Sequence, residues 1–335
     1  MYIVNSYALA VGLCFITMLC WGSWGNTQKL AAKTWRYELF YWDYVIGVLL
    51  FSIIMGLTLG SIGNQGRSFI PDLMQVSARN FGSAFLGGII FNASNILLSA
   101  ALSLAGMAVA FPVGVGLALV LGVFINYFGA PYGDPFTLFF GVGLIVLALV
   151  FNGVAYSKMN KGKDKKQSTK GLLIALAAGF LMSFFYRFVA AAMDLENFES
   201  PTPGMVTPYT AVFILALGML FSNFFFNTLV MKKPFVGAPV TYKAYFNGNI
   251  KTHSVGILGG LIWCLGTSIS YIATGEAGAA ISYALGQGAT MVAALWGVFI
   301  WKEFKGASKT INILLLLMFI LFITGLALII IAGNR

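Results

Sequence analysis

The chain has 335 residues, of which 59% are hydrophobic and only 9% are charged, with a net charge of +10. Soluble globular proteins carry about 25% charged residues, so this composition excludes that class and indicates an integral membrane protein. All three cysteines lie inside apolar runs, where we expect buried small hydrophobes rather than reactive thiols.

Apolar runs long enough to cross about 30 Å of hydrocarbon recur along the whole chain. We expect the first run to be a helix rather than a cleaved signal, because no basic residue precedes it and another span follows at once. The fold class is therefore predicted as all-α, with ten transmembrane helices over residues 6–26, 38–60, 81–104, 107–128, 136–157, 171–193, 209–231, 255–274, 278–301 and 309–332.

The basic residues follow alternate loops. The loops after the first, third, fifth, seventh and ninth spans carry 16 of the 20 Lys and Arg residues, whereas the termini and the other loops carry only Arg67, Arg79 and Arg335. Because basic loops stay cytoplasmic, both termini are predicted on the outer side of a cell (inner) membrane. The positive charge thus reports topology and does not indicate a nucleic-acid partner.

An internal repeat links the two halves of the chain. At an offset of 172 residues, the segment 87–120 matches 259–292 at ten of 34 positions, including Gly87-Gly88 on Gly259-Gly260. Gly114 and Gly116 match Gly286 and Gly288 in the same way. Glycine permits close backbone approach, either to another helix or to a ligand.

The repeat predicts three parts: a five-helix repeat over 1–157, a Lys-rich cytoplasmic connector over 158–170 and a second five-helix repeat over 171–335. An odd number of spans inverts the second repeat in the membrane. Inverted repeats with a binding site near the midplane are typical of secondary transporters. A pore or a membrane-embedded enzyme could also use this architecture, but the repeat favours a transporter.

Three ionisable residues lie within or at the ends of spans: Asp43, Arg187 and Glu276. Charges inside a membrane suggest function by default. One hypothesis is that Asp43 pairs with Arg187 and locks two helices together; the other is that Asp43 or Glu276 carries a proton that drives transport. Gly47 lies one turn after Asp43 and would let a neighbouring helix approach.

Polar and aromatic side chains mark a candidate binding site. If the ninth span starts early, Glu276 begins a stripe that continues along that helix, and amides follow one face of the third span. Amides, a phenol and indoles suit a neutral planar or polyhydroxylated solute, although single polar residues can also join helices and tryptophans can mark interfaces. The predicted substrate-binding residues are Trp21, Trp24, Asn92, Asn95, Trp263, Tyr283, Gln287 and Thr290.

The sequence offers little for catalysis. His253 is the single histidine, so a histidine metal site or a Ser/His/Asp triad is not expected. The sequence contains no phosphate-binding G-x-x-x-x-G-K-[ST] motif, which argues against ATP-driven pumping by this chain. We therefore expect neither an enzyme nor a metal or organic cofactor.

Three stretches carry a family resemblance: "YWDYVIGVLLFSIIMGLTLGSIG", "PVTYKAYFNG" and "GEAGAAISYALGQGATMVAALWGVFIWKEF". They resemble the ureide permeases of the drug/metabolite transporter superfamily, and the likeness runs through nearly the whole chain. The resemblance implies a ten-helix inverted-repeat fold and proton-linked uptake of allantoin-like ureides, uracil or xanthine. Asp43 corresponds to the acidic residue of the family's Leu-Asp-Tyr type sequence.

The chain departs from that family in its short central loop and in Arg187 and Glu276, which bear on the charge of the cavity. Related branches of the superfamily carry glucose, ribose or rhamnose. The sequence thus predicts a proton-coupled importer of a small neutral polar metabolite, most simply a ureide or nucleobase, with the lipid bilayer, the solute and protons as its partners. The alternatives are a sugar or nucleoside transporter and a metabolite exporter of the same superfamily.

Overall fold

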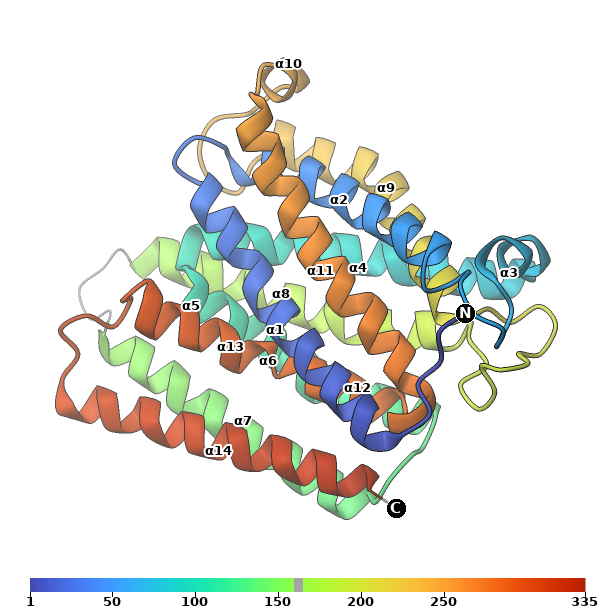
Figure 1. The fold of residues 1–335 in the computed structure, drawn as a ribbon. Helices are drawn as coiled ribbons and strands as arrows, with labels where there is room; N and C mark the ends of the chain where they lie inside the picture. The colour runs from blue at the N-terminus through green and yellow to red at the C-terminus, as the bar shows by residue number, and fades with distance from the viewer. Residues whose placement is uncertain (160–164, 335) are drawn as a thin grey trace.

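The computed structural model describes residues 1–159 and 165–334 (Figure 1). Within them the ordered structure is helical apart from one isolated β-bridge between Met193 and Val206, which confirms the all-α prediction. The elements are α1 (Tyr7–Ala31), α2 (Tyr37–Leu57), α3 (Phe69–Gln75), α4 (Ala78–Ala105), α5 (Met107–Ala110), the π-helix η1 (Phe111–Val115), α6 (Gly116–Gly129), α7 (Pro135–Met159), α8 (Lys165–Ala190), α9 (Pro208–Lys232), α10 (Tyr242–Phe246), α11 (Ile250–Ala277), α12 (Ala279–Gln287), α13 (Ala289–Leu295), the π-helix η2 (Trp296–Ile300) and α14 (Lys309–Gly333).

Ten helical segments of the described residues are long and apolar enough to cross a membrane, and each overlaps one predicted span. The largest differences are at α8, which begins at Lys165 rather than 171, at α1, which ends at Ala31 rather than 26, and at α11, which begins at Ile250 rather than 255. These extensions are polar ends that the apolar runs did not include. The predicted connector 158–170 includes residues 160–164, which lie outside the described residues.

Local sequence explains where several helices begin and where two of them end. Ser6, Ser77, Asn249 and Ser308 accept a hydrogen bond from the backbone N–H three residues on, as N-caps do. Gly106 ends α4 with φ 81°, and Gly278 ends α11 with φ 73°, a conformation that favours glycine. These two glycines are 172 residues apart, so the internal repeat places the same stop signal in both halves.

Two helix crossings depend on glycines at matching places. A Cβ at Gly47 of α2 would lie 2.2 Å from a carbonyl oxygen of α11 and 3.1 Å from the Cα atom of Gly260. A Cβ at Gly218 of α9 would lie 2.2 Å from a carbonyl oxygen of α4 and 3.0 Å from that helix's Phe85 carbonyl carbon. Only glycine allows the backbones to approach this closely, as small residues do in membrane helix pairs.

The helix pairs occur in matched sets. α1 and α2 both pack on α11, while α8 and α9 both pack on α4, and the peripheral α7 and α14 pack on each other (Figure 1). Helices from residues 1–157 and from 171–335 therefore interleave instead of forming two separate bodies. This pairing is what a two-fold-related pair of repeats would produce, and the inverted orientation of the second repeat stays a prediction.

The two ends of the helix bundle differ in charge. One end, here called the basic face, carries the loops 32–36, 233–249 and 301–308, which lie toward the left of Figure 1. The other end, the terminal face, carries both chain ends, α3 and the loop 191–207, toward the right. The predicted division of charge between alternate loops thus corresponds to two opposite ends of the structure.

Candidate functional site

Two membrane helices are interrupted at corresponding places. On the first, the π-helix η1 contains Pro112 and gives way to α6 at Gly116; on the second, α12 ends at Gln287 and α13 begins after Gly288. Gly116 and Gly288 are again 172 residues apart. Interrupted helices at matching positions in two halves indicate the substrate site of a transporter, because they expose backbone and side-chain polar groups at membrane depth.

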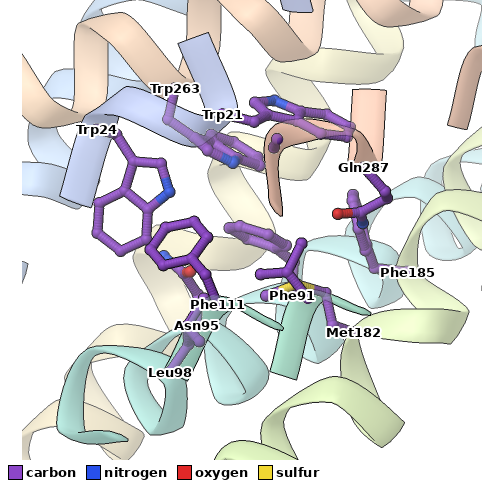
Figure 2. A pocket seen from close by; sticks show the side chains of 12 residues that line it. Trp21, Trp24, Phe91, Asn95, Leu98, Phe111, Met182, Phe185, Trp263 and Gln287 are labelled. Carbon is purple, nitrogen blue, oxygen red and sulfur yellow. The ribbon is translucent and has the colours of Figure 1, made fainter. Parts of the chain in front are cut away.

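A cavity lies where these interruptions meet the neighbouring helices (Figure 2). The space between its lining atoms, including the part open to solvent, has a volume of about 300 Å³. This space is narrow, with room for only about one or two water molecules, so the walls must move apart before a metabolite can bind. The lining residues are Trp21, Trp24, Phe91, Asn95, Leu98, Phe111, Val115, Met182, Phe185, Trp263, Gln287 and Ala289.

Aromatic rings form most of the wall. Trp263 stacks on Phe91 with ring centroids 4.2 Å apart and on Trp21 at 6.4 Å with an interplanar angle of 12°. The indole N–H of Trp21 donates to Thr267 Oγ1 at 3.0 Å, which fixes the orientation of that ring. Stacked and offset rings of this kind present flat apolar faces that a planar or ring-shaped solute can cover.

Two amides interrupt the aromatic wall from opposite sides. Figure 2 shows Asn95 beside Phe111 and Gln287 across the cavity from it. Asn95 is 1% exposed, and its Nδ2 makes no hydrogen bond of good geometry among the described residues. A buried donor without a partner costs about 1–3 kcal/mol, so a solute that accepts a hydrogen bond here would recover that energy.

Five of the eight predicted substrate-binding residues line this cavity. They come from α1 (Trp21 and Trp24), α4 (Asn95), α11 (Trp263) and α12 (Gln287). The sequence pattern singled out these cavity-lining residues because an amide or an indole stands out inside an apolar span; their role in binding a solute stays a prediction.

The other three predicted residues do not line the cavity and bond to neighbouring helices or to their own helix. Asn92 donates to Ser222 Oγ of α9 at 2.9 Å, and Tyr283 donates to the carbonyl of Ala118 at 3.0 Å. Thr290 donates to the Gln287 carbonyl at 3.1 Å. Their polar groups join helices, which is the alternative reading of polar residues in membrane spans.

Asp43 does not pair with Arg187. Its Oδ1 accepts from the Tyr245 hydroxyl at 2.7 Å and from His253 Nδ1 at 2.7 Å, and its Oδ2 accepts from Trp35 Nε1 at 3.1 Å. The helices explain the difference: Asp43 lies near the start of α2 at the basic face, whereas Arg187 lies near the end of α8 at the terminal face. Three donors thus satisfy the carboxylate that the apolar sequence left unexplained.

The other two intramembrane charges lie at the terminal face. Glu276 belongs to α11 and not to an early start of the ninth span, because Gly278 ends α11. It is half-buried and has no ion-pair partner among the described residues. Arg187 lies against Gly129 and Glu276 adjoins Tyr132, which donates to the Glu276 backbone carbonyl at 2.8 Å. Both charges therefore border the segment that follows α6.

The sequence reasoning missed two kinds of residue. The apolar lining residues Phe91, Phe111 and Phe185 carry no signal, since they look like any other phenylalanine in a span. Tyr245 and His253 did carry one: the first lies in the "YKAYF" segment that hydrophobicity does not require, and the second is the chain's single histidine.

Known proteins resemble this chain in sequence and in fold. Two Arabidopsis thaliana proteins, ureide permease 1 and ureide permease 4, are 23% and 24% identical to it, each over 98% of this chain and over 97% and 98% of their own lengths. The Bacillus subtilis (strain 168) glucose uptake protein GlcU is 25% identical over 78% of this chain and 83% of its own.

A solved crystal structure of a protein superposes on 96% of both chains with a TM-score of 0.60 at 16% sequence identity, which shows a shared fold. The model of the ureide permease family matches residues 40–170 and 161–332. These matches cover well over half of the sequence. Members of the ureide permease family are transporters and not enzymes. The chain belongs to the ureide permease family.

Proposed function

We propose that this chain is a secondary transporter that imports a small neutral polar metabolite, most simply a ureide or a nucleobase, together with a proton. The observation that carries the proposal is the cavity at the meeting of two interrupted helices. Its flat aromatic walls suit a planar ring, and its two amides suit a solute rich in amide-like donors and acceptors.

The topology in this proposal follows the charge distribution. The basic face lies on the cytoplasmic side of the cell membrane, and the terminal face, with both chain ends, lies on its outer side. Two five-helix repeats, 1–157 and 171–335, have opposite orientations, and rearrangement of their interleaved helices exposes the cavity first to one face and then to the other.

Glu276 is the proposed proton site. It is a half-buried carboxyl group near the face that we place outside, and it has no ion-pair partner among the described residues. Asp43 is less suited to this role because three donors already satisfy its oxygens.

A sugar transporter is the second candidate, since relatives named for glucose and sugar uptake match most of the chain. Hydroxyl groups could use the same two amides, and a sugar ring could lie on the same aromatic faces. Export instead of import would leave the cavity unchanged and reverse the direction of the driven flux.

The test is uptake by purified protein in liposomes with an imposed inward proton gradient. We expect labelled allantoin or uracil to accumulate above the external concentration, and a protonophore to abolish this accumulation. Accumulation of glucose alone would support the second candidate. Equilibration without accumulation would show a passive channel and contradict the proposal.

Glu276→Gln keeps the size and hydrogen-bonding capacity of the side chain and removes its titration. We expect the variant to exchange labelled for unlabelled solute but to lose proton-driven accumulation. Asp43→Asn tests the other carboxylate: if this variant keeps exchange but loses accumulation, and Glu276→Gln does not, the proton site has been assigned to the wrong carboxylate.

A further inference from the structure

The segment that joins α9 to α11, residues 233–249, lies across part of the basic face and carries the short helix α10. It is fastened to the corner between α1 and α2, where Arg36 donates to the carbonyls of Val236, at 3.0 Å, and Ala238. The segment also bonds to α9 through Tyr242 and Thr228. It therefore connects parts of the chain that lie about 200 residues apart in sequence.

The innermost attachment of this segment is the carboxylate of Asp43. It is 1% exposed and joins three separate elements: the loop after α1 through Trp35, α10 through Tyr245 and α11 through His253. The His253 ring packs edge-on against both aromatic partners, with centroids 5.2 Å from Trp35 and 4.9 Å from Tyr245. These four residues are called the Asp43 latch below.

His253 gives the latch a group that responds to protons near neutral pH. Imidazole is the side chain whose charge ordinarily changes between about pH 5 and 8. Because the Asp43 carboxylate can only accept, His253 donates its Nδ1–H, and its Nε2 faces Gly248 in the segment. The His253 side chain is 22% exposed, so the imidazole is in contact with the solvent at the basic face.

The other charged groups around His253 do not compete for this role. Arg36 and Glu38 pair with each other, and the lysines of the adjoining elements, Lys33, Lys243 and Lys251, are exposed. Burial and the nearby Asp43 carboxylate raise the pKa of Tyr245, so its phenol remains a hydrogen-bond donor. Among the groups in direct contact with Asp43, His253 alone carries an imidazole, the side chain whose charge ordinarily changes between about pH 5 and 8.

We propose that the Asp43 latch closes the basic face and that protons on that side tighten it through His253. Protonation at Nε2 turns the Nδ1–H···carboxylate bond into an ion pair, which is stronger than the neutral bond. A proton that binds the latched form more tightly than the released form shifts the equilibrium toward the latched form. On the proposed topology, acidification of the cytoplasm would slow solute release into the cell.

Amide hydrogen exchange of the full-length protein in lipid nanodiscs measures the latch directly. Exchange of residues 241–249 is followed at about pH 5.5 and pH 8, each corrected for the intrinsic exchange rate. We expect protection to be about fivefold greater at the lower pH, because charge-assisted hydrogen bonds are roughly twice as strong as neutral ones. Helix α3 on the opposite face, with no histidine near it in the sequence, serves as an internal control.

His253→Gln keeps a donor but cannot gain a proton, so its protection over residues 241–249 should be the same at both pH values. Tyr245→Phe removes one donor and should lower protection at both pH values while keeping the fivefold difference. Equal protection at both pH values in the unmodified protein, or lower protection in acid, would overturn the proposal. Since no solute is used, failure here is distinct from failure of the transport proposal.

Discussion

The α2–α11 crossing and the α9–α4 crossing have the same backbone contact and different side chains. In each, a glycine Cβ would come within 2.2 Å of a carbonyl oxygen on the partner helix, at Gly47 in the first and at Gly218 in the second. The reciprocal glycines, Gly260 and Gly88, are equally close to Tyr44 and Leu215 carbonyls, at 2.0 and 2.1 Å. The repeat thus supplies one scaffold twice.

The side chains one or two turns from these contacts differ in kind. Asp43, four residues before Gly47, bonds to His253, seven residues before Gly260, at the basic face. At the same spacing from Gly218 and Gly88, the chain has Ile214 and Phe81, which are apolar. The backbone contact is thus shared by both halves of the chain, whereas the polar latch belongs to one crossing and therefore to one face of the membrane.

The largest expected effect comes from filling either shared contact. Gly47→Leu and Gly218→Leu should each prevent folding or cost more than about 3 kcal/mol, because a backbone carbonyl cannot move aside as a flexible side chain can. Gly143→Leu is the matched control, since a Cβ there meets nothing within 4 Å. Size-exclusion profiles and melting temperatures in detergent measure the effect. A well-folded Gly218→Leu protein with an unfolded Gly47→Leu protein would show that the two crossings are not equivalent.

An exchange of side-chain chemistry between the crossings should have the next largest effect. Ile214→Asp places a carboxylate in the α9–α4 crossing at the position that Asp43 has in the α2–α11 crossing. Among the described residues, the α9–α4 crossing has no donor to match it, so the buried charge should lower the free energy of unfolding by about 3–5 kcal/mol. Asp43→Ile removes the carboxylate and leaves three donors, of which Tyr245 and His253 are partly exposed and can bond to water, so it should cost less. Thermal unfolding of both variants decides the order; a smaller cost for Ile214→Asp would contradict the comparison.

The smallest effect concerns the loop 191–207 of the terminal face. Burial opposes the ionised form of Asp194, but hydrogen bonds from Thr202 N at 2.9 Å and Oγ1 at 2.7 Å outweigh it and lower the pKa of Asp194. A depressed pKa in the folded state stabilises the fold above the unfolded-state value and loses that contribution as pH falls below about 4.

Thr202→Val removes one of these bonds with little change in shape. It should reduce the loss of melting temperature between about pH 5 and 3, by an amount corresponding to less than about 1 kcal/mol because Asp194 is largely exposed to solvent. An unchanged acid response in the variant would show that this hydrogen bond does not set the pKa.

The sequence predicted the parts of the fold that local composition determines. Apolar length placed ten spans to within a few residues, and paired glycines such as Gly106 and Gly278 marked equivalent breaks. The sequence could not predict which helices cross, because a glycine indicates a close contact with another helix but does not identify that helix. The predicted pair of Asp43 with Arg187 was wrong for that reason.

The candidate site was predicted where its chemistry stands out from the membrane. Trp24, Asn95 and Gln287 are unusual within apolar spans, and all three line the cavity. Asn92 is equally unusual and does not line it, because sequence alone cannot say which face of a helix points to the cavity. The partners of Asp43 lie up to 210 residues away in sequence, so only the tertiary structure joins them.

Asn95 and Asn92 allow the most direct test of the cavity as the substrate site. Asn95→Leu removes a buried donor that makes no hydrogen bond of good geometry among the described residues, so the melting temperature without solute should stay the same or rise. Asn92→Leu removes the bond to Ser222, so the melting temperature without solute should fall. The measurement is the melting shift of each purified protein with allantoin, uracil, xanthine, uridine, ribose, glucose and rhamnose.

A solute at about 100 times its dissociation constant should stabilise the unmodified protein by about 2.7 kcal/mol. We expect a heterocycle to produce this shift in the unmodified protein. The Asn92→Leu variant should keep the shift, and the Asn95→Leu variant should lose most of it. A full shift in Asn95→Leu, or its loss in Asn92→Leu alone, would contradict the claim that the aromatic cavity binds the transported solute.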